Sequence, residues 1–211
     1  MFYPCCGVQY VYKTMNIPSR KESLGIICRA EMLEHIAAHS LQVCRVALVI
    51  TDLLNREKTM LNRELVQAGA LLHDITKTRS LKTGERHAET GGRFLCELGY
   101  PEVGELVRQH VRLDHFDFHS PVNEAEIVNY ADKRVLHDQI VPLQKRMEYI
   151  LHRYGTTPEI RIRLEQIGQE AKSQEKKIFA RICFAPEELA DHMDSPGCDA
   201  EMAEYRNALL L

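Results

Sequence analysis

Residues 62–77 read Asn-Arg-Glu-Leu-Val-Gln-Ala-Gly-Ala-Leu-Leu-His-Asp-Ile-Thr-Lys and combine a helix start, a dense apolar run and two ionisable side chains. Asn62 is a favoured N-cap residue, and the apolar residues after it are too closely spaced for a surface helix. We therefore predict a helix in the centre of the core. His73 and Asp74 close this helix, so an imidazole and a carboxylate leave the protein interior side by side.

Helical periodicity continues on both sides of this segment. Residues 21–54 carry a broad apolar stripe, with Pro18-Ser19 as the predicted turn and N-cap and Gly25 as the expected division between a short and a long helix. Further helices are expected at residues 87–98, 101–111, 123–137, 140–154 and 158–179, with a short helical tail at 186–211. No β-alternating run of consequence and no internal repeat interrupts them, so the predicted fold class is all-α, a helical bundle.

Two segments lack helical periodicity. Residues 77–86 are polar, basic and contain Gly84, which predicts a loop over the mouth of the site that His73 and Asp74 build. Residues 112–121 are aromatic and rich in histidine, and they are expected to be irregular.

Composition limits the partners. The 211 residues include 27 basic and 30 acidic side chains for a formal charge of −3, spread along the chain. No overall field favours nucleic acid or an anionic membrane, so neither is expected as a partner. A polyanionic substrate would need local attraction.

The seven cysteines show no metal-type Cys-x-x-Cys spacing. Reduced thiols in a cytoplasmic protein are the natural interpretation. Residues 1–9 lack the basic start, apolar run and cleavage site of a signal peptide, and no uninterrupted apolar stretch approaches the ~20 residues that span a bilayer. The expected location is therefore the cytoplasm.

Four ionisable residues, His39, His73, Asp74 and Asp132, lie on three predicted helices with apolar faces, so folding can bring them into one pocket. Imidazole and carboxylate together suit a divalent first-row transition metal. Such an ion lowers the pKa of a bound water from 15.7 toward neutrality, which favours hydrolysis.

These residues resemble the pattern of the HD-domain superfamily of metal-dependent phosphohydrolases. The likeness runs from about Glu34 to Arg134 and includes the helix led by His39, the stretch Ala70 to Lys77, and Tyr130-Ala131-Asp132-Lys133. The order and spacing are most similar to the small binuclear bacterial HD hydrolases of symmetrical diadenosine tetraphosphate. The resemblance implies an HD-domain helical bundle that cleaves a phosphoanhydride or phosphoester of a nucleotide or dinucleotide by a metal-bound hydroxide.

The resemblance also implies roles for particular residues. His39, His73 and Asp132 would hold one ion, His87 and His110 a second, and Asp74 would bridge the two. The two divalent transition-metal ions would be iron first, with Mn, Ni, Co or Mg as alternatives. Asp74 and Lys77 are the catalytic candidates, and the substrate-binding candidates are Lys77, Arg86, Arg112 and Lys133.

Alternatives stay open at this point. His87 and His110 stand at predicted helix ends, where a histidine needs no special role, and Lys77 is as consistent with plain solvation as with a phosphate contact. The chain departs from the subfamily at residues 112–121 and in the extension after Tyr154. A diiron oxygenase and a noncatalytic metal- or nucleotide-binding regulator are the alternative functions.

The expected organisation is an N-terminal segment at residues 1–20, an HD domain at 21–155, and a C-terminal helical extension at 156–211 packed on the same domain. A small-molecule nucleotide or dinucleotide is the expected partner, and a homodimer is left open.

Overall fold

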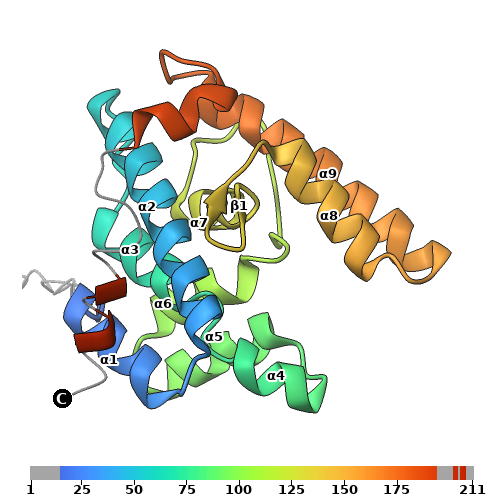
Figure 1. Cartoon of the computed structure of the whole chain (residues 1–211). Helices are drawn as coiled ribbons and strands as arrows, with labels where there is room; N and C mark the ends of the chain where they lie inside the picture. Colours follow the sequence, from blue (N-terminus) through green and yellow to red (C-terminus); the bar gives the residue numbers. More distant parts are fainter. Residues whose placement is uncertain (1–14, 194–201, 204, 208–211) are drawn as a thin grey trace, which may run out of the picture.

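The computed structural model describes residues 15–193, 202–203 and 205–207. Over these residues the fold is all-α, as predicted, with a single two-stranded hairpin (Figure 1). The elements are α1 (Arg20–Arg29), α2 (Glu34–Arg56), α3 (Arg63–Leu72), α4 (Lys77–Thr83), α5 (His87–Glu97), α6 (Pro101–Gln109), α7 (Glu124–Asp132), β1 (Val135–Leu136), β2 (Gln139–Ile140), α8 (Leu143–Tyr154), α9 (Pro158–Phe179) and a 3₁₀ helix (Pro186–His192).

Helix α1 begins at the predicted N-cap. The Ser19 hydroxyl accepts from the Glu22 N–H, and the Glu22 carboxylate accepts from the Ser19 N–H, which forms a capping box. The expected division at Gly25 is wrong, because Gly25 lies inside α1. The chain turns instead at residues 30–33, where Glu31 has a positive φ of 50°.

Helix α2 runs through the core. Its length and apolarity would allow it to cross a membrane, but 67% of its most apolar window is buried inside the protein. It packs against α3, which Asn62 caps by accepting from the Leu65 N–H, as predicted. The α3 residues from Leu65 to Leu72 are buried except Gln67, so His73 emerges from the interior.

Helices α5 and α6 form a tight antiparallel pair. Gly99, with a φ of 88°, makes the turn between them. A Cβ on Gly92 would lie 2.7 Å from the Gly104 carbonyl oxygen, so only glycine permits this approach. The close packing sets His87, at the start of α5, beside His110, which follows α6.

The predicted loop at residues 77–86 is largely the short helix α4. Its last residues, Leu81 to Thr83, are exposed, and the left-handed Gly84 ends it. Similarly, the helix expected to reach residue 137 stops at Asp132, and a tight β1–β2 hairpin follows, with His137 at a φ of 56° in its turn.

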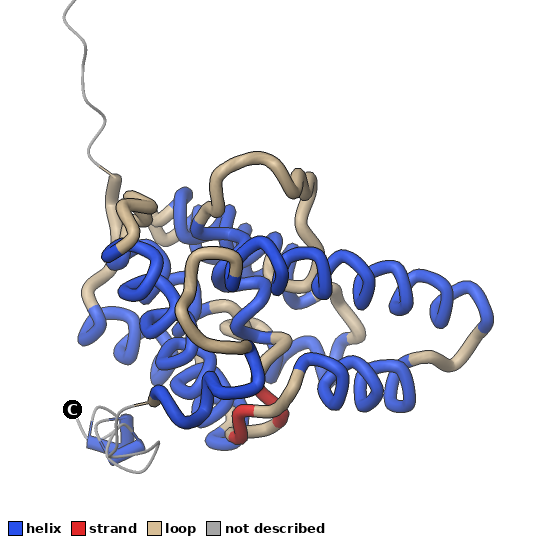
Figure 2. Tube along the Cα trace, turned by 90° about the horizontal axis from the view of Figure 1, so that it is seen from above, coloured by secondary structure: helices blue, strands red, loops and turns tan. Residues whose placement is uncertain are grey.

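Helices α8 and α9 form a hairpin that projects beyond the other helices (Figure 1 and Figure 2). The C-terminal half of α9 is fixed to α7 by buried polar contacts. Lys177 Nζ lies 2.7 Å from Glu126 Oε1, and the Tyr130 hydroxyl donates to Glu175 Oε2 over 2.6 Å. The N-terminal half of α9 instead lines a cavity.

The predicted tail at 186–211 is helical where it is described. The 3₁₀ helix is followed by helical residues at 202–203 and 205–207, where Tyr205 donates to the Met32 carbonyl over 3.2 Å. The cysteines among the described residues are free, as predicted; they are Cys28, Cys44, Cys96 and Cys183. Cys5, Cys6, Cys198 and the segment 1–14 lie outside the described residues.

Candidate metal centre

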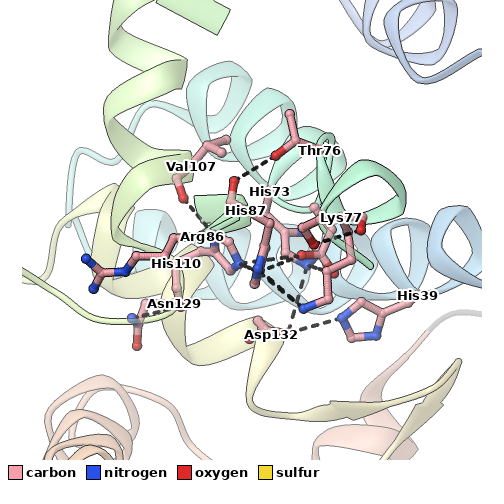
Figure 3. Close-up of polar contacts among 12 residues, drawn as sticks. His39, His73, Thr76, Lys77, Arg86, His87, Val107, His110, Asn129 and Asp132 are labelled. Carbon is pink, nitrogen blue, oxygen red and sulfur yellow. Dashed lines mark hydrogen bonds and ion pairs between the residues drawn. The ribbon is translucent and has the colours of Figure 1, made fainter. Parts of the chain in front are cut away.

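Six histidine and aspartate side chains from five separate places in the chain converge on one point in the core (Figure 3). They are the six residues expected from the sequence: His39 on α2, His73 and Asp74 after α3, His87 at the start of α5, His110 after α6 and Asp132 at the end of α7. We call this set the metal-ligand cluster. It divides into two groups that share Asp74.

The first group contains His39, His73, Asp74 and Asp132. His39 Nε2 lies 3.1 Å from Asp132 Oδ1. His73 Nε2 lies 3.6 Å from Asp74 Oδ2 and 3.9 Å from Asp132 Oδ1. Ligand atoms of His39, His73 and Asp74 all lie within 4.8 Å of one another, which is close enough to hold one ion.

The second group contains Asp74, His87 and His110. Asp74 Oδ1 lies 3.1 Å from His87 Nε2 and 3.6 Å from His110 Nε2. The two Nε2 atoms are 3.2 Å apart. The two oxygens of Asp74 thus face different groups of imidazoles, which is the arrangement that a bridging carboxylate needs.

Backbone carbonyls fix the orientation of three imidazoles. The Nδ1 atoms of His39, His73 and His110 lie 2.7, 2.8 and 2.6 Å from the carbonyl oxygens of His137, Ala70 and Val107. A carbonyl can only accept, so each Nδ1 carries a proton and donates it. In the neutral imidazole the Nε2 lone pair then points into the cluster, as in metal-binding histidines.

Most pKa shifts in the cluster favour the neutral imidazole and the ionised carboxylate. Complete burial lowers the pKa of His73 to about 4, and burial also lowers the pKa of His87. Burial opposes ionisation of Asp74 and Asp132, but the surrounding imidazoles hold the pKa of both carboxyls well below the usual value. Burial lowers the pKa of His39 too, yet the hydrogen bond and charge of Asp132 raise it overall. Deprotonated ligand atoms therefore dominate the cluster.

These residues fit a metal ion. Among the described residues, the buried atoms His73 Nε2 and Asp74 Oδ1 have no hydrogen bond of acceptable geometry, although buried polar atoms normally have one. Lone pairs of nitrogen and oxygen face one another across 3–4 Å, an arrangement that a cation stabilises. The mixed imidazole and carboxylate set suits a divalent transition metal.

The expected substrate-binding residues lie in different surroundings. Lys77 Nζ lies 3.3 Å from His87 Nε2 and lines a cavity of about 240 Å³ over the cluster. Lys133 lines the same cavity but is 3% exposed, and its Nζ donates to Asn129 Oδ1 and to the Asn129 and His110 carbonyls. Burial lowers the pKa of Lys133 to about 8. Arg86 and Arg112 line a neighbouring cavity instead.

Arg146 was missed from the sequence. Its Nη2 lies 3.5 Å from Asp132 Oδ1, and its buried Nε has no hydrogen bond to any residue that the structure describes. With Ile150 and Tyr154 it forms an i, i+4, i+8 row on α8, and the row lines the cavity together with Leu164 and Ile167 of α9. The row was visible in the sequence, but nothing local indicated that α8 folds back over the cluster.

Comparison with known proteins places an HD domain at residues 36–135. That interval contains all six residues of the metal-ligand cluster and stops before α8. Among solved structures, the chain is similar to one described as a predicted HD superfamily hydrolase from an uncultured Thermotogales bacterium. The two are 23% identical, with 79% of this chain and 95% of that chain covered and a TM-score of 0.42. No curated protein matches the chain.

Proposed function

We propose that this protein is a metal-dependent phosphohydrolase that cleaves a phosphoanhydride or phosphoester bond of a nucleotide or dinucleotide. The observation that carries the proposal is Asp74, whose two carboxylate oxygens face two groups of histidines inside an HD domain. Two divalent ions bound there would activate water and neutralise charge on a phosphoryl oxygen. We assign His39, His73 and Asp132 to one ion, His87 and His110 to the other, and Asp74 to both.

The side chains around the cluster have separate tasks. Lys77 reaches the cavity from the first turn of α4 and offers positive charge to a phosphate oxygen. Arg146 reaches the same cavity from α8, and its Nε, which has no hydrogen-bond partner among the described residues, can donate to a second oxygen. Lys77 and Arg146 would bind a phosphoryl group near Asp74 and Asp132, whose negative charges bound ions would offset.

The apolar part of the cavity lining fits a nucleotide better than a simple phosphate ester. Ile150, Leu164 and Ile167 are apolar, and Tyr154 adds an aromatic ring that is half exposed. An apolar and aromatic wall facing a charged floor suits a ligand with a planar base and a phosphate.

The test is metal analysis of anaerobically purified protein, followed by phosphate release from nucleotides and dinucleoside polyphosphates. We expect close to two ions per chain and release that depends on them. Oxygen uptake is measured in parallel, because a diiron oxygenase would consume oxygen without releasing phosphate. Absence of phosphate release after reconstitution with Fe, Mn, Ni, Co and Mg would refute the proposal.

A further inference from the structure

A second cavity, of about 510 Å³, opens beside the first. It is formed by the start of α5, the end of α6, the segment after α6 and the first half of α9. His87 and Val111 line both cavities. The consecutive α9 residues Arg163 and Leu164 line the second and the first cavity respectively, so a ligand can extend from the metal-ligand cluster into the larger space.

Arginine dominates the charge of this second cavity. Arg86, Arg108, Arg112 and Arg163 line it, against two acidic residues, Glu89 and Asp114. Both acids are already paired: Arg86 lies 2.6 Å from Glu89, and Arg108 binds Asp114. The wall therefore carries an excess of positive charge.

Arg112 and Arg163 supply that excess. Neither side chain forms an ion pair or a hydrogen bond with another residue in the described part of the chain, and both residues are exposed. They come from two different parts of the chain, Arg112 from the segment after α6 and Arg163 from α9. Two unpaired guanidinium groups that face a concave space attract and bind anions better than scattered surface arginines.

We propose that this cavity is a second anion-binding subsite that holds the distal phosphates of the substrate. The inference rests on the proposed function and narrows it to substrates with a polyphosphate chain, whose cleaved phosphate lies at the metal-ligand cluster. Phosphate oxygens match the guanidinium fork, and the cavity is large enough for several phosphate groups. Arg112 lies inside the HD domain and Arg163 outside it, so the C-terminal hairpin contributes to this preference.

The test measures binding directly, by calorimetry on the purified metal-loaded protein with inorganic triphosphate and with orthophosphate. Wild type should bind triphosphate more tightly than orthophosphate. Arg163→Gln and Arg112→Gln should each weaken triphosphate binding by about tenfold, the usual effect of losing one charged hydrogen bond, and weaken orthophosphate binding less.

The matched control is Arg161→Gln. Arg161 is exposed on the same helix, donates to the Gly155 carbonyl and is absent from the residues lining either cavity. Unchanged triphosphate affinity in Arg163→Gln and Arg112→Gln, or an equal loss in Arg161→Gln, would overturn the subsite. If no nucleotide is hydrolysed but triphosphate binding still depends on Arg163, the proposed function fails and the subsite stands. If hydrolysis occurs without that dependence, the subsite alone fails.

Discussion

Arg146 Nη2 lies 3.5 Å from Asp132 Oδ1, and this ion pair joins helix α8 to the metal-ligand cluster. Asp132 also lies 3.1 Å from His39 Nε2, so one carboxylate connects α2, inside the HD domain, with α8, which lies beyond the end of the domain. The site is consequently larger than the segment that the family match covers.

Replacing Arg146 tests whether it contacts the substrate. We expect Arg146→Gln to raise KM by about tenfold, because one charged hydrogen bond is lost, while metal content is retained. Lys145→Gln, an exposed neighbour on α8, is the control and should leave KM unchanged. A loss of metal with unchanged KM would instead show that Arg146 acts only by holding Asp132.

Removing the charge of Asp74 should disable both halves of the cluster. Asp74→Asn keeps the side-chain shape but weakens its bonding to each ion, so metal content and turnover should fall by more than about a hundredfold. Circular dichroism should stay helical because the core of α2 and α3 is untouched. Asp52→Asn, on the exposed part of α2 beside Arg63, is the control. Wild-type activity in Asp74→Asn would contradict the assignment of Asp74.

Mutations in the two groups of ligands should each remove one metal ion and leave the other. His110→Ala removes an Nε2 that lies 3.6 Å from Asp74 Oδ1, and we expect metal content to fall from two ions per chain toward one. His39→Ala should have the same stoichiometric effect through the other group. Elemental analysis of the purified variants measures it. Two ions per chain in His110→Ala would remove the second site from the proposal.

The close packing of α5 and α6 should control stability as well as the site. A Cβ on Gly104 would clash with the Gly92 carbonyl oxygen and lie 2.8 Å from Cys96 Sγ. We expect Gly104→Ala to lower the free energy of unfolding by about 1–3 kcal/mol, as overpacking does. Gly25→Ala is the control, because its Cβ would meet only the flexible Arg29 side chain at 3.3 Å. Urea unfolding compares the two, and an equal effect would contradict the packing argument.

Breaking the buried Glu126–Lys177 pair should make the free energy of unfolding depend more strongly on pH. Burial raises the pKa of Glu126 even with Lys177 beside it. Lys177→Met removes that partner, so the folded-state pKa rises further above the unfolded value. Glu126 then binds more protons in the folded than in the unfolded state, and stability falls as pH rises through the folded-state pKa.

We expect the free energy of unfolding of Lys177→Met to be lower than wild type by about 3–5 kcal/mol at neutral pH, with a smaller loss near the unfolded pKa of Glu126. Urea unfolding at the two pH values measures the difference. The double variant Glu126→Gln, Lys177→Met should lose the added pH dependence. An equal loss for Lys177→Met at both pH values would show that packing, not charge, is responsible.

Local sequence determined most of the helices. Apolar spacing, the caps Ser19, Asn62 and Asn123, and the turn at Gly99 act within a few residues, so these features could be predicted without the fold. The errors also have local causes. Gly25 is tolerated inside α1 because the buried face of the helix outweighs its cost, and the polar segment after Lys77 forms a helix that is too short for its periodicity to be seen.

The sequence by itself therefore determined the all-α class and the identities of the six residues in the metal-ligand cluster, because side-chain chemistry and helical period are local properties. Only the tertiary structure decided what surrounds them. Three features depend on how elements distant in the sequence pack together. They are the His137 carbonyl that orients His39, the Arg146 side chain beside Asp132, and the position of Arg163 in the second cavity. Packing between two helices sets their relative position, and this packing depends on residues from both helices, so no single stretch of sequence predicts it.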